Sequence, residues 1–335
     1  MTSAVPAPDL AATTLRLIDV PSESRSEAEI VGLVRELMPG SPTYDDGEVL
    51  LYGEGPIVLA GHVDTVPAQG NVPGRIADGA VHGLGASDMK AGVAVMVELA
   101  RAGVPARYLF FTREEVPVSD SPLPGLFATG MLADAELAVV LEPTDNDLHA
   151  GCLGNLQARV TFHGESAHSA RPWTGVNAIH ELVRGLQPLV ALAPEDVELD
   201  GLVFREVVSA VRVGGGIAAN VVPASAWVDL NARFVRPGME EQLRALLPDG
   251  ELEVIAESPS APPALGNPHV ARLRELVPSV KPKQAWTPVA QFAEQGIDAI
   301  NYGPGATAYA HRVDEQVPIA NLEQCYEVLR VFLTD

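Results

Sequence analysis

Residues 57–90 read IVLAGHVDTVPAQGNVPGRIADGAVHGLGASDMK, and the other motifs of the chain can be placed around this stretch. Its first residues are apolar and predict a buried strand that ends at about His62 and stops before Pro67. Asp64 lies two residues beyond His62, so the two side chains share one face of an extended segment. Asp88 stands on a glycine-rich turn that leads into a helical pattern. The stretch therefore predicts a polar site at the carboxyl end of a buried strand.

The composition is that of a globular protein with a strongly acidic surface. The 335 residues are enough for two domains, and the hydrophobic fraction is 47%. The net charge of -22 disfavours nucleic acid and anionic membranes, so we expect neither as a partner. The 2 cysteines are too few for a disulfide framework, and the N-terminal residues lack a basic signal-peptide segment. These features predict a cytoplasmic protein.

Strands alternate with helices in the first part of the chain. Apolar runs predict buried strands at 56–61, 107–112 and 137–141. This alternation indicates an α/β sheet with helices on both faces. Glu115 follows the second of these strands and Glu142 follows the third. Because ligands of open α/β sheets bind at the carboxyl ends of strands, we expect these carboxylates to converge on one crevice.

The order of elements changes in the middle of the chain. Residues 156–257 follow the order strand, helix, strand, strand, helix, strand, which is typical of a ferredoxin-like unit. A segment rich in proline, alanine and serine at 259–268 then leads back to an α/β pattern. We therefore expect one domain formed by residues 1–152 and 262–335, with residues 153–261 inserted as an α+β domain.

Five side chains of the metal-ligand type fall at predicted strand ends or in glycine-rich loops: His62, Asp88, Glu115, Glu142 and His311. Imidazole and carboxylate without thiolate suit Zn²⁺ or a similar first-row ion in a hydrolytic site. Two such ions can share a bridging carboxylate, and three carboxylates with one hydroxide would balance their charge. A single acidic residue is more often a solvated loop residue or a helix cap. The joint placement of all five favours a metal site.

Several motifs resemble those of the co-catalytic zinc amidohydrolases of the M20 peptidase family, and within it the succinyl-diaminopimelate desuccinylases. They are LAGHVDTVP (59–67), GASDMK (85–90), Glu114-Glu115, Glu142-Pro143-Thr144, GESAHSARP (164–172) and Tyr309-Ala310-His311 with Asp314-Glu315. They follow the order of the family over nearly the whole chain. The resemblance implies a di-zinc aminopeptidase-like catalytic domain with an inserted ferredoxin-like lid and dimerisation domain.

The resemblance also implies how the five ligands are shared. His62 and Glu142 would hold one zinc ion, Glu115 and His311 would hold the other, and Asp88 would bridge the two. Co²⁺ can take the place of zinc in such a site. The peptide bond directly after Asp88 would be cis, as in the family.

Three catalytic residues follow from the same resemblance. Asp64 would orient His62, because a metal-bound imidazole usually donates its second N–H to a fixed partner. Glu114 would be the general base that takes a proton from the bridging water, while the adjacent Glu115 serves as a ligand. His168 would come from the partner subunit of a homodimer and would stabilise the oxyanion of the tetrahedral intermediate.

The substrate is an N-acyl amino acid by the same resemblance. Asn220 and Arg233 match positions that contact a substrate carboxylate, and Arg171 would assist from the lid. Desuccinylases of the family carry Asp and Arg in a string like T-D-x-A-R-F, whereas this chain reads WTPVAQF, with Pro288 and Gln291 in those places. This departure affects the substrate and leaves the metal ligands intact.

The predicted reaction is metal-dependent hydrolysis of an N-acyl amide. The resemblance favours N-succinyl-LL-2,6-diaminopimelate, cleaved to succinate and LL-2,6-diaminopimelate in lysine biosynthesis. The alternatives are another N-acyl amino acid such as N-acetylornithine, a dipeptide, or an inactive relative that only binds its ligand.

Overall fold

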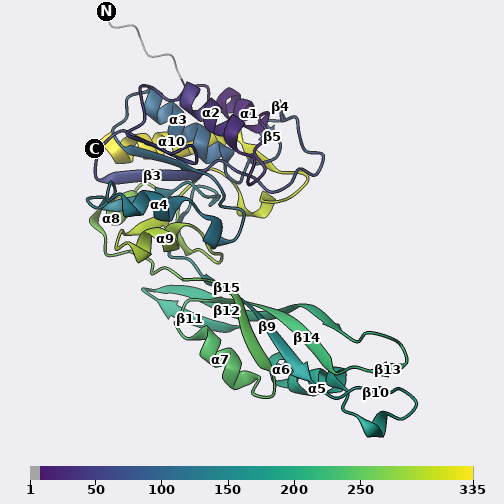
Figure 1. Cartoon of the computed structure of the whole chain (residues 1–335). Helices are drawn as coiled ribbons and strands as arrows, with labels where there is room; N and C mark the ends of the chain where they lie inside the picture. Colours follow the sequence, from purple (N-terminus) through teal and green to yellow (C-terminus); the bar gives the residue numbers. More distant parts are fainter. Residues whose placement is uncertain (1–7, 335) are drawn as a thin grey trace, which may run out of the picture. The chain divides into compact units, whose positions relative to one another are not determined.

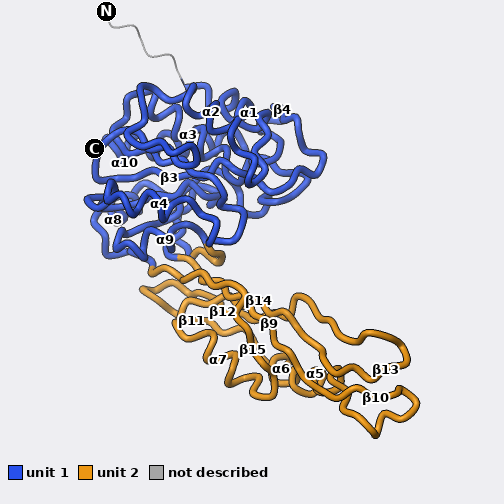
Figure 2. The backbone as a smooth tube through the Cα atoms, viewed as in Figure 1, with its two compact units in different colours: residues 1–151, 263–282, 287–335 blue, residues 152–262, 283–286 orange. Residues whose placement is uncertain are grey.

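The computed structural model describes residues 8–334, and the chain divides into two compact units (Figure 2). Unit 1 comprises Met1–Gly151, Pro263–Pro282 and Thr287–Asp335, and unit 2 comprises Cys152–Pro262 and Lys283–Trp286. Across the described residues, no helix has the length and apolar character that crossing a membrane requires.

An eight-stranded sheet forms the centre of unit 1 (Figure 1). Its order is β1-β2-β6-β3-β7-β17-β8-β16, and β6, β3, β7 and β17 run parallel to one another. The strands are β1 (Tyr44–Asp45), β2 (Val49–Tyr52), β3 (Ile57–His62), β6 (Arg107–Phe111), β7 (Leu137–Val140), β8 (Leu148–Ala150), β16 (Val280–Pro282) and β17 (Ala299–Asn301). Every residue of β3 and β7 is buried, as expected for parallel strands with helices on both faces.

Helices cover the two faces of this sheet (Figure 1). One face carries α1 (Leu10–Ile18), α2 (Ala28–Leu37), α3 (Lys90–Arg101) and α10 (Ile319–Thr334); the other carries α4 (Leu123–Ala128), α8 (Pro268–Arg274) and α9 (Val289–Glu294). α3 comes very close to the sheet at Gly92, where a Cβ atom would lie 2.5 Å from the carbonyl oxygen of Leu141. Only glycine permits this approach without a shift of the backbone.

A small antiparallel sheet joins two distant segments of unit 1. It contains β4 (Arg75–Ala77), β5 (Ala80–His82) and β18 (Gln316–Pro318), in the order β18-β5-β4. The pairing of β5 with β18 brings the chain just before Asp88 beside the chain just after His311. Two candidate ligands that are far apart in sequence are thus placed on neighbouring loops.

Unit 2 is built on a five-stranded antiparallel sheet with the order β11-β12-β14-β9-β15. The strands are β9 (Gly154–His163), β11 (Glu195–Leu199), β12 (Leu202–Gly215), β14 (Ser225–Phe234) and β15 (Glu251–Ser258). The helices are α5 (Ala178–Gly185), α6 (Gln187–Ala191) and α7 (Met239–Leu246), and a short ribbon pairs β10 (Ala167–His168) with β13 (Val221–Val222). Without β11, the element order is that of a ferredoxin-like unit.

The hydrophobic core of unit 2 lies between the sheet and its helices. Phe162 and Leu230 from the strands contribute to the same buried cluster as Leu182 from α5 and Leu243 from α7. Burial of large apolar side chains on one face of the sheet is the main favourable contribution to folding of such a unit.

The short segment Lys283–Trp286 belongs to unit 2 although its neighbours in sequence belong to unit 1. The side chain of Gln284 accepts the N–H of Arg205 at 3.1 Å and donates to the carbonyl of Val203 at 2.8 Å. The N–H of Leu153 donates to the carbonyl of Ala285 at 3.2 Å. These hydrogen bonds attach the segment to the beginning of β12 and to the residue before β9, and no run of apolar residues indicates them.

Candidate metal centre

Three candidate ligands lie at the carboxyl ends of neighbouring parallel strands. His62 is the last residue of β3, Glu115 follows β6, and Glu142 follows β7. β6 and β7 flank β3 on its two sides. All three side chains therefore come together at one edge of the sheet, which is where open α/β sheets bind ligands.

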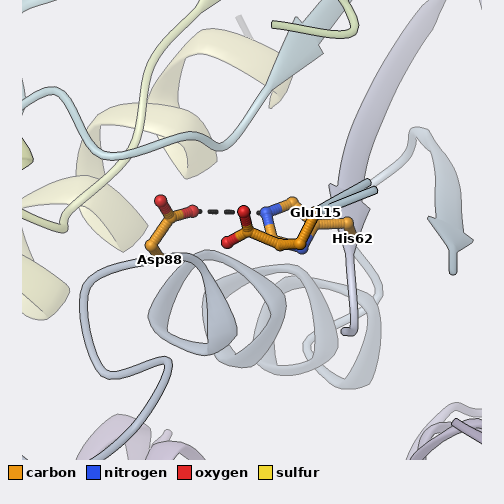
Figure 3. Close-up of side chains that lie close together, drawn as sticks. All are labelled: His62, Asp88 and Glu115. Atoms are coloured by element: carbon orange, nitrogen blue, oxygen red, sulfur yellow. Dashed lines mark hydrogen bonds and ion pairs between the residues drawn. The ribbon is translucent and has the colours of Figure 1, made fainter. Parts of the chain in front are cut away.

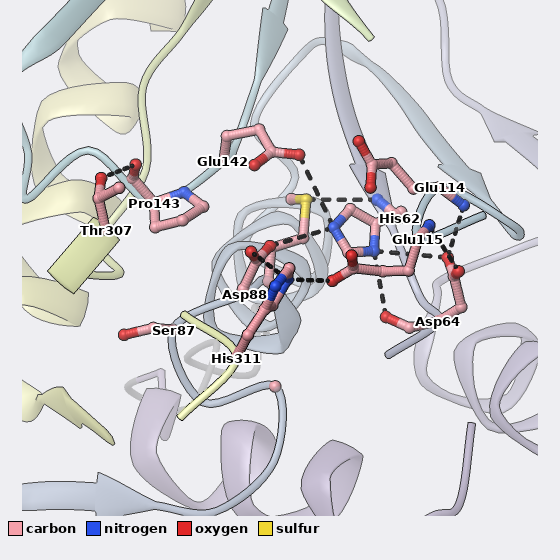
Figure 4. A network of polar contacts seen from close by, with 12 residues as sticks. His62, Asp64, Ser87, Asp88, Glu114, Glu115, Glu142, Pro143, Thr307 and His311 are labelled. Atoms are coloured by element: carbon pink, nitrogen blue, oxygen red, sulfur yellow. Dashed lines mark hydrogen bonds and ion pairs between the residues drawn. The ribbon is translucent and has the colours of Figure 1, made fainter. Parts of the chain in front are cut away.

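Asp88 lies between the two candidate histidines. It directly precedes the first turn of α3, and the peptide bond between Asp88 and Met89 is cis, as the resemblance implies. Its Oδ1 atom lies 3.2 Å from Nε2 of His62, and its Oδ2 atom lies 3.5 Å from Nε2 of His311 (Figure 4). The two oxygens of this carboxylate thus face two different imidazoles.

Each histidine also has a carboxylate of its own. Nε2 of His62 lies 3.7 Å from Oε1 of Glu142, and Nε2 of His311 lies 2.8 Å from Oε1 of Glu115. The ligand atoms of His62, Asp88 and Glu115 lie within 4.8 Å of one another (Figure 3). The contacts of His62 with Glu142 and of His311 with Glu115 divide the donors into two groups that share Asp88. Nitrogen and oxygen donors of this kind fit a first-row divalent ion in each group.

The carboxylates favour the protonated form of both imidazoles. Burial alone would lower the pKa of His62, but its hydrogen bonds to Asp64 and Asp88 raise that pKa well above its usual value. Hydrogen bonds to Asp88 and Glu115 raise the pKa of His311 to about 10. The raised pKa of each histidine reflects an excess of negative charge around it, which bound divalent cations would neutralise.

Glu114 lies beside the two ligand groups. Its backbone N–H donates to Oδ1 of Asp64 at 3.1 Å, which fixes its main chain. Burial, followed by the negative charges of Glu142 and Glu115, raises the pKa of the Glu114 carboxyl well above its usual value. A carboxyl group whose pKa is raised in this way holds a proton more readily than an exposed glutamate, as a general base must.

Asp64 is completely buried and connects the histidine to the segment after β6 (Figure 4). Its Oδ1 atom lies 3.4 Å from Nδ1 of His62. Its two oxygens accept the backbone N–H groups of Glu114 and Glu115 at 3.1 Å each, and Oδ2 also accepts the hydroxyl of Ser24 at 2.7 Å. Ser24 carries no motif of its own, so sequence reasoning did not single it out.

Glu315 is a second buried carboxylate near the site. It belongs to a motif noted in the sequence, but sequence reasoning gave it no role. Its oxygens accept the backbone N–H groups of Gly85, Ser87 and Asp88, each at 2.9 Å. Burial raises its pKa to about 7, although the three N–H groups favour the ionised form.

Residues 58–335 match the model of peptidase family M20/M25/M40. The chain belongs to this family. A Mycobacterium tuberculosis protein provisionally named succinyl-diaminopimelate desuccinylase is 38% identical over an alignment of 347 positions, gaps included, that covers 96% of each chain. The Corynebacterium glutamicum succinyl-diaminopimelate desuccinylase is 34% identical, over 96% of this chain and 95% of that protein. An M20 family metallo-carboxypeptidase from Sulfolobus solfataricus shares the fold, with a TM-score of 0.76, 15% identity and coverage of 98% and 99%.

Membership of the M20/M25/M40 family confirms the predicted fold class and the prediction of a metal-dependent amidohydrolase. The remaining candidates of this M20 chain lie on unit 2. His168 ends β10 and is exposed, and its carbonyl accepts the N–H of Arg171 at 2.7 Å. The carbonyl of Asn220 accepts the N–H of Ser169 at 3.0 Å. His168, Arg171 and Asn220 therefore lie on neighbouring segments of unit 2.

Arg233 lies at the opposite end of the unit 2 sheet. Ser225 begins β14 shortly after Asn220, whereas Arg233 is near its end and pairs with Asn155. The eight residue steps between Ser225 and Arg233 span about 27 Å of extended strand. Nε of Arg233 donates to Asn231 at 3.1 Å, and its guanidinium forms no ion pair within residues 8–334. Unit 2 thus does not bring Arg233 together with Asn220.

The two positions that depart from the desuccinylase pattern lie at the start of α9. Pro288 precedes the helix, and Gln291 is buried within it. Nε2 of Gln291 donates to the hydroxyl of Ser121 at 3.0 Å, so its amide already has a protein partner. Arg312, the arginine that follows His311 in sequence, donates to the carboxylate of Asp314 at 2.7 and 2.9 Å, so it also has a protein partner.

Proposed function

We propose that this protein hydrolyses N-succinyl-LL-2,6-diaminopimelate to succinate and LL-2,6-diaminopimelate with two bound zinc ions. The observation that carries the proposal is the position of the Asp88 carboxylate between two pairs of candidate ligands. One oxygen faces His62, which lies beside Glu142, and the other faces His311, which lies beside Glu115. The desuccinylase names of the relatives that match 96% of the chain support the choice of substrate.

His62 and Glu142 would hold one zinc ion, His311 and Glu115 the other, and Asp88 would contribute one oxygen to each. Bound zinc polarises the amide carbonyl and lowers the pKa of a bound water, and Co²⁺ can do the same. Three ligand carboxylates lower the charge of the pair of ions, so that the site can be partly buried at lower cost.

The protein's own groups would then move the proton and hold the ligands. The carboxylate of Glu114 takes the proton of the attacking water and passes it to the nitrogen of the leaving amine. Asp64 keeps the ring of His62 in one orientation, because Nδ1 faces both its backbone carbonyl at 3.1 Å and its carboxylate at 3.4 Å and leaves Nε2 to face Asp88. Burial and the neighbouring carboxylates raise the pKa of Glu114, which favours uptake of the proton from the water.

We further propose that the enzyme is a homodimer formed through residues 153–261. Unit 2 exposes large apolar side chains: Trp173, Val190, Val213 and Ile217. A contiguous exposed apolar patch is typical of a surface that binds another protein, and we propose that these side chains contribute to such a patch. His168 would donate a hydrogen bond to the oxyanion at the neighbouring molecule's site, with Asn220 and Arg171 beside it as substrate contacts.

The substrate carries three carboxylates, while the protein has a net charge of -22. Two zinc ions and Arg233 would supply the local positive charge, since charge-assisted hydrogen bonds are about twice as strong as neutral ones. Because Gln291 is neutral and bonded to Ser121, we expect a KM above that of desuccinylases with arginine at this position. Cys152 and Cys325 are buried and form no disulfide, in keeping with the cytoplasmic location that we propose.

Measurement of kcat/KM for N-succinyl-LL-diaminopimelate, N-acetylornithine and a dipeptide panel tests this proposal. The zinc-loaded protein should prefer the succinylated substrate. Glu114→Gln should bind zinc normally and lose nearly all turnover, which separates a true catalyst from a contaminating activity. A clear preference for N-acetylornithine or a dipeptide would contradict the substrate, and no turnover on any amide would indicate an inactive relative.

A further inference from the structure

Two loops carry the shared ligand and one of the histidines, and a single buried side chain joins them. Asp88 ends one loop, His311 begins the other, and Glu315 lies four residues after His311. Glu315 is only 2% exposed. Its Oε1 atom accepts the N–H groups of Ser87 and Asp88, and its Oε2 atom accepts the N–H of Gly85. One carboxylate therefore holds three N–H groups of the loop that carries the shared ligand.

Further contacts fix the same two loops to each other. The backbone N–H of Gly83 donates to the carbonyl of Glu315 at 3.0 Å, and the hydroxyl of Ser87 donates to the carbonyl of Gln316 at 2.7 Å. On the histidine side, the carbonyl of His311 accepts the side-chain amide of Gln69 at 3.1 Å. These hydrogen bonds hold the main chain of Glu315, so the position of its carboxylate relative to the Asp88 loop is fixed.

His311 itself has a backbone conformation that needs such support. Its φ angle is +61°, in the left-handed region that non-glycine residues seldom adopt. Residues in that region persist where the surrounding structure holds them. The hydrogen bond from Gln69 and the anchored Glu315 hold the two ends of this turn.

The chemistry of the anchor requires a carboxylate. Both oxygens of Glu315 accept hydrogen bonds from N–H groups, and a carboxylate can accept at both positions. A glutamine would present its NH₂ group either to Gly85 or to Ser87 and Asp88, and a buried donor would then face another donor. Burial of a carboxyl group is costly, and the three N–H groups that Glu315 accepts lie directly behind the shared ligand, which indicates a role in placing that ligand.

We propose that Glu315 is the positioning residue for Asp88. It fixes the backbone of residues 85–88 so that Oδ1 of Asp88 faces His62 while Oδ2 faces His311. This inference rests on the proposed two-metal function and adds a residue that neither binds an ion nor touches the substrate. Loss of this anchor lets the Asp88 carboxylate rotate, and the two ligand groups then no longer share it in a fixed geometry.

The test compares Glu315→Gln with wild type and with Glu206→Gln. Glu206 is a matched control because it is also a buried carboxylate that accepts two backbone N–H groups, from Val235 and Arg236, but it lies in unit 2. Each metal-free protein is titrated with Zn²⁺ by calorimetry and with Co²⁺ by visible absorption, and its melting temperature is recorded.

We expect both variants to melt at lower temperature than wild type. Only Glu315→Gln should lose metal affinity, by about 10–100-fold for at least the second ion, the range typical of residues that orient metal ligands. Its Co²⁺ absorption should also change, whereas the spectrum of Glu206→Gln should match wild type. If Glu315→Gln binds both ions with wild-type affinity, the proposal is wrong.

The outcomes separate this inference from the proposed function. If wild type and Glu315→Gln both bind two ions with the same affinities, the proposed role of Glu315 is wrong and the two-metal function stands. Fewer than two ions in wild type would overturn the two-metal function and the inference with it. If Glu315→Gln does not fold, Glu315→Asp is titrated instead, because it keeps the charge and withdraws the carboxylate by one methylene. Unchanged affinity for both ions in that variant would equally overturn the proposal.

Discussion

Replacement of Asp64 by asparagine should weaken metal binding and destabilise unit 1 at the same time. Asp64 has no exposed surface, and its two oxygens have four neighbours: Nδ1 of His62, the N–H groups of Glu114 and Glu115, and the hydroxyl of Ser24. An asparagine has one oxygen and one NH₂ group in the same space. The NH₂ group must therefore face the N–H of either Glu114 or Glu115, and that backbone donor loses its acceptor.

The expected magnitude follows from these contacts. A buried donor without a partner costs about 1–3 kcal/mol, so the free energy of unfolding of the metal-free protein should fall by that amount. The ring of His62 also loses the carboxylate opposite Nδ1. Loss of such a partner typically lowers metal affinity or activity by about 10–100-fold, which corresponds to about 1.4–2.8 kcal/mol.

Two assays separate these effects. Denaturant unfolding of the metal-free protein measures the change in the free energy of unfolding, and calorimetric titration with Zn²⁺ measures the change in zinc affinity. Ser24→Ala is the control, because it removes one hydrogen bond to Asp64 and leaves the carboxylate in place, at an expected cost of about 1 kcal/mol. If Asp64→Asn matched wild type in both stability and zinc affinity, the role given to Asp64 would be refuted.

Three further predictions concern other parts of the chain. Gly92→Ala should lower the free energy of unfolding by about 1–3 kcal/mol in denaturant titrations, because the new methyl group would meet the carbonyl of Leu141. His168→Ala should lower kcat by about 100–1,000-fold and leave zinc content unchanged; near-wild-type turnover would exclude an oxyanion role. Burial would raise the pKa of Glu206, but hydrogen bonds from Arg236 lower it below its usual value. Wild type should therefore have a higher free energy of unfolding than Glu206→Gln at pH 7. This difference should shrink as the pH falls below about 4, and denaturant unfolding at pH 7 and at a pH below about 4 measures it.

The strand-end residues could be placed from the sequence because each follows an apolar run. His62 ends one buried strand, Glu115 and Glu142 follow two others, and the parallel order of β6, β3 and β7 brings these ends together. Periodicity and strand length are local properties, so they can be seen in one stretch of sequence. The edge strand β11 escaped prediction because three of its five residues are acidic and only Val197 and Leu199 alternate.

The residues that support the site could not be found in this way. Ser24 is 40 residues from its partner Asp64 in sequence, and Glu315 is more than 200 residues from its partner Ser87. Only the folded structure brings these residues together. Asn220 precedes β14 and Arg233 lies near the end of that strand, so the length of the extended strand separates them. A match to a family motif identifies candidate substrate-binding residues, but it does not show which of them lie close together in the folded protein.

The location of metal ions in a crystal of the zinc-loaded protein tests the central claim most directly. Anomalous diffraction at the zinc edge should show two peaks about 3.5–4 Å apart, one on each side of the Asp88 carboxylate. One peak should lie beside His62 and Glu142, and the other beside His311 and Glu115. A single peak, or two peaks that do not share Asp88, would contradict the account.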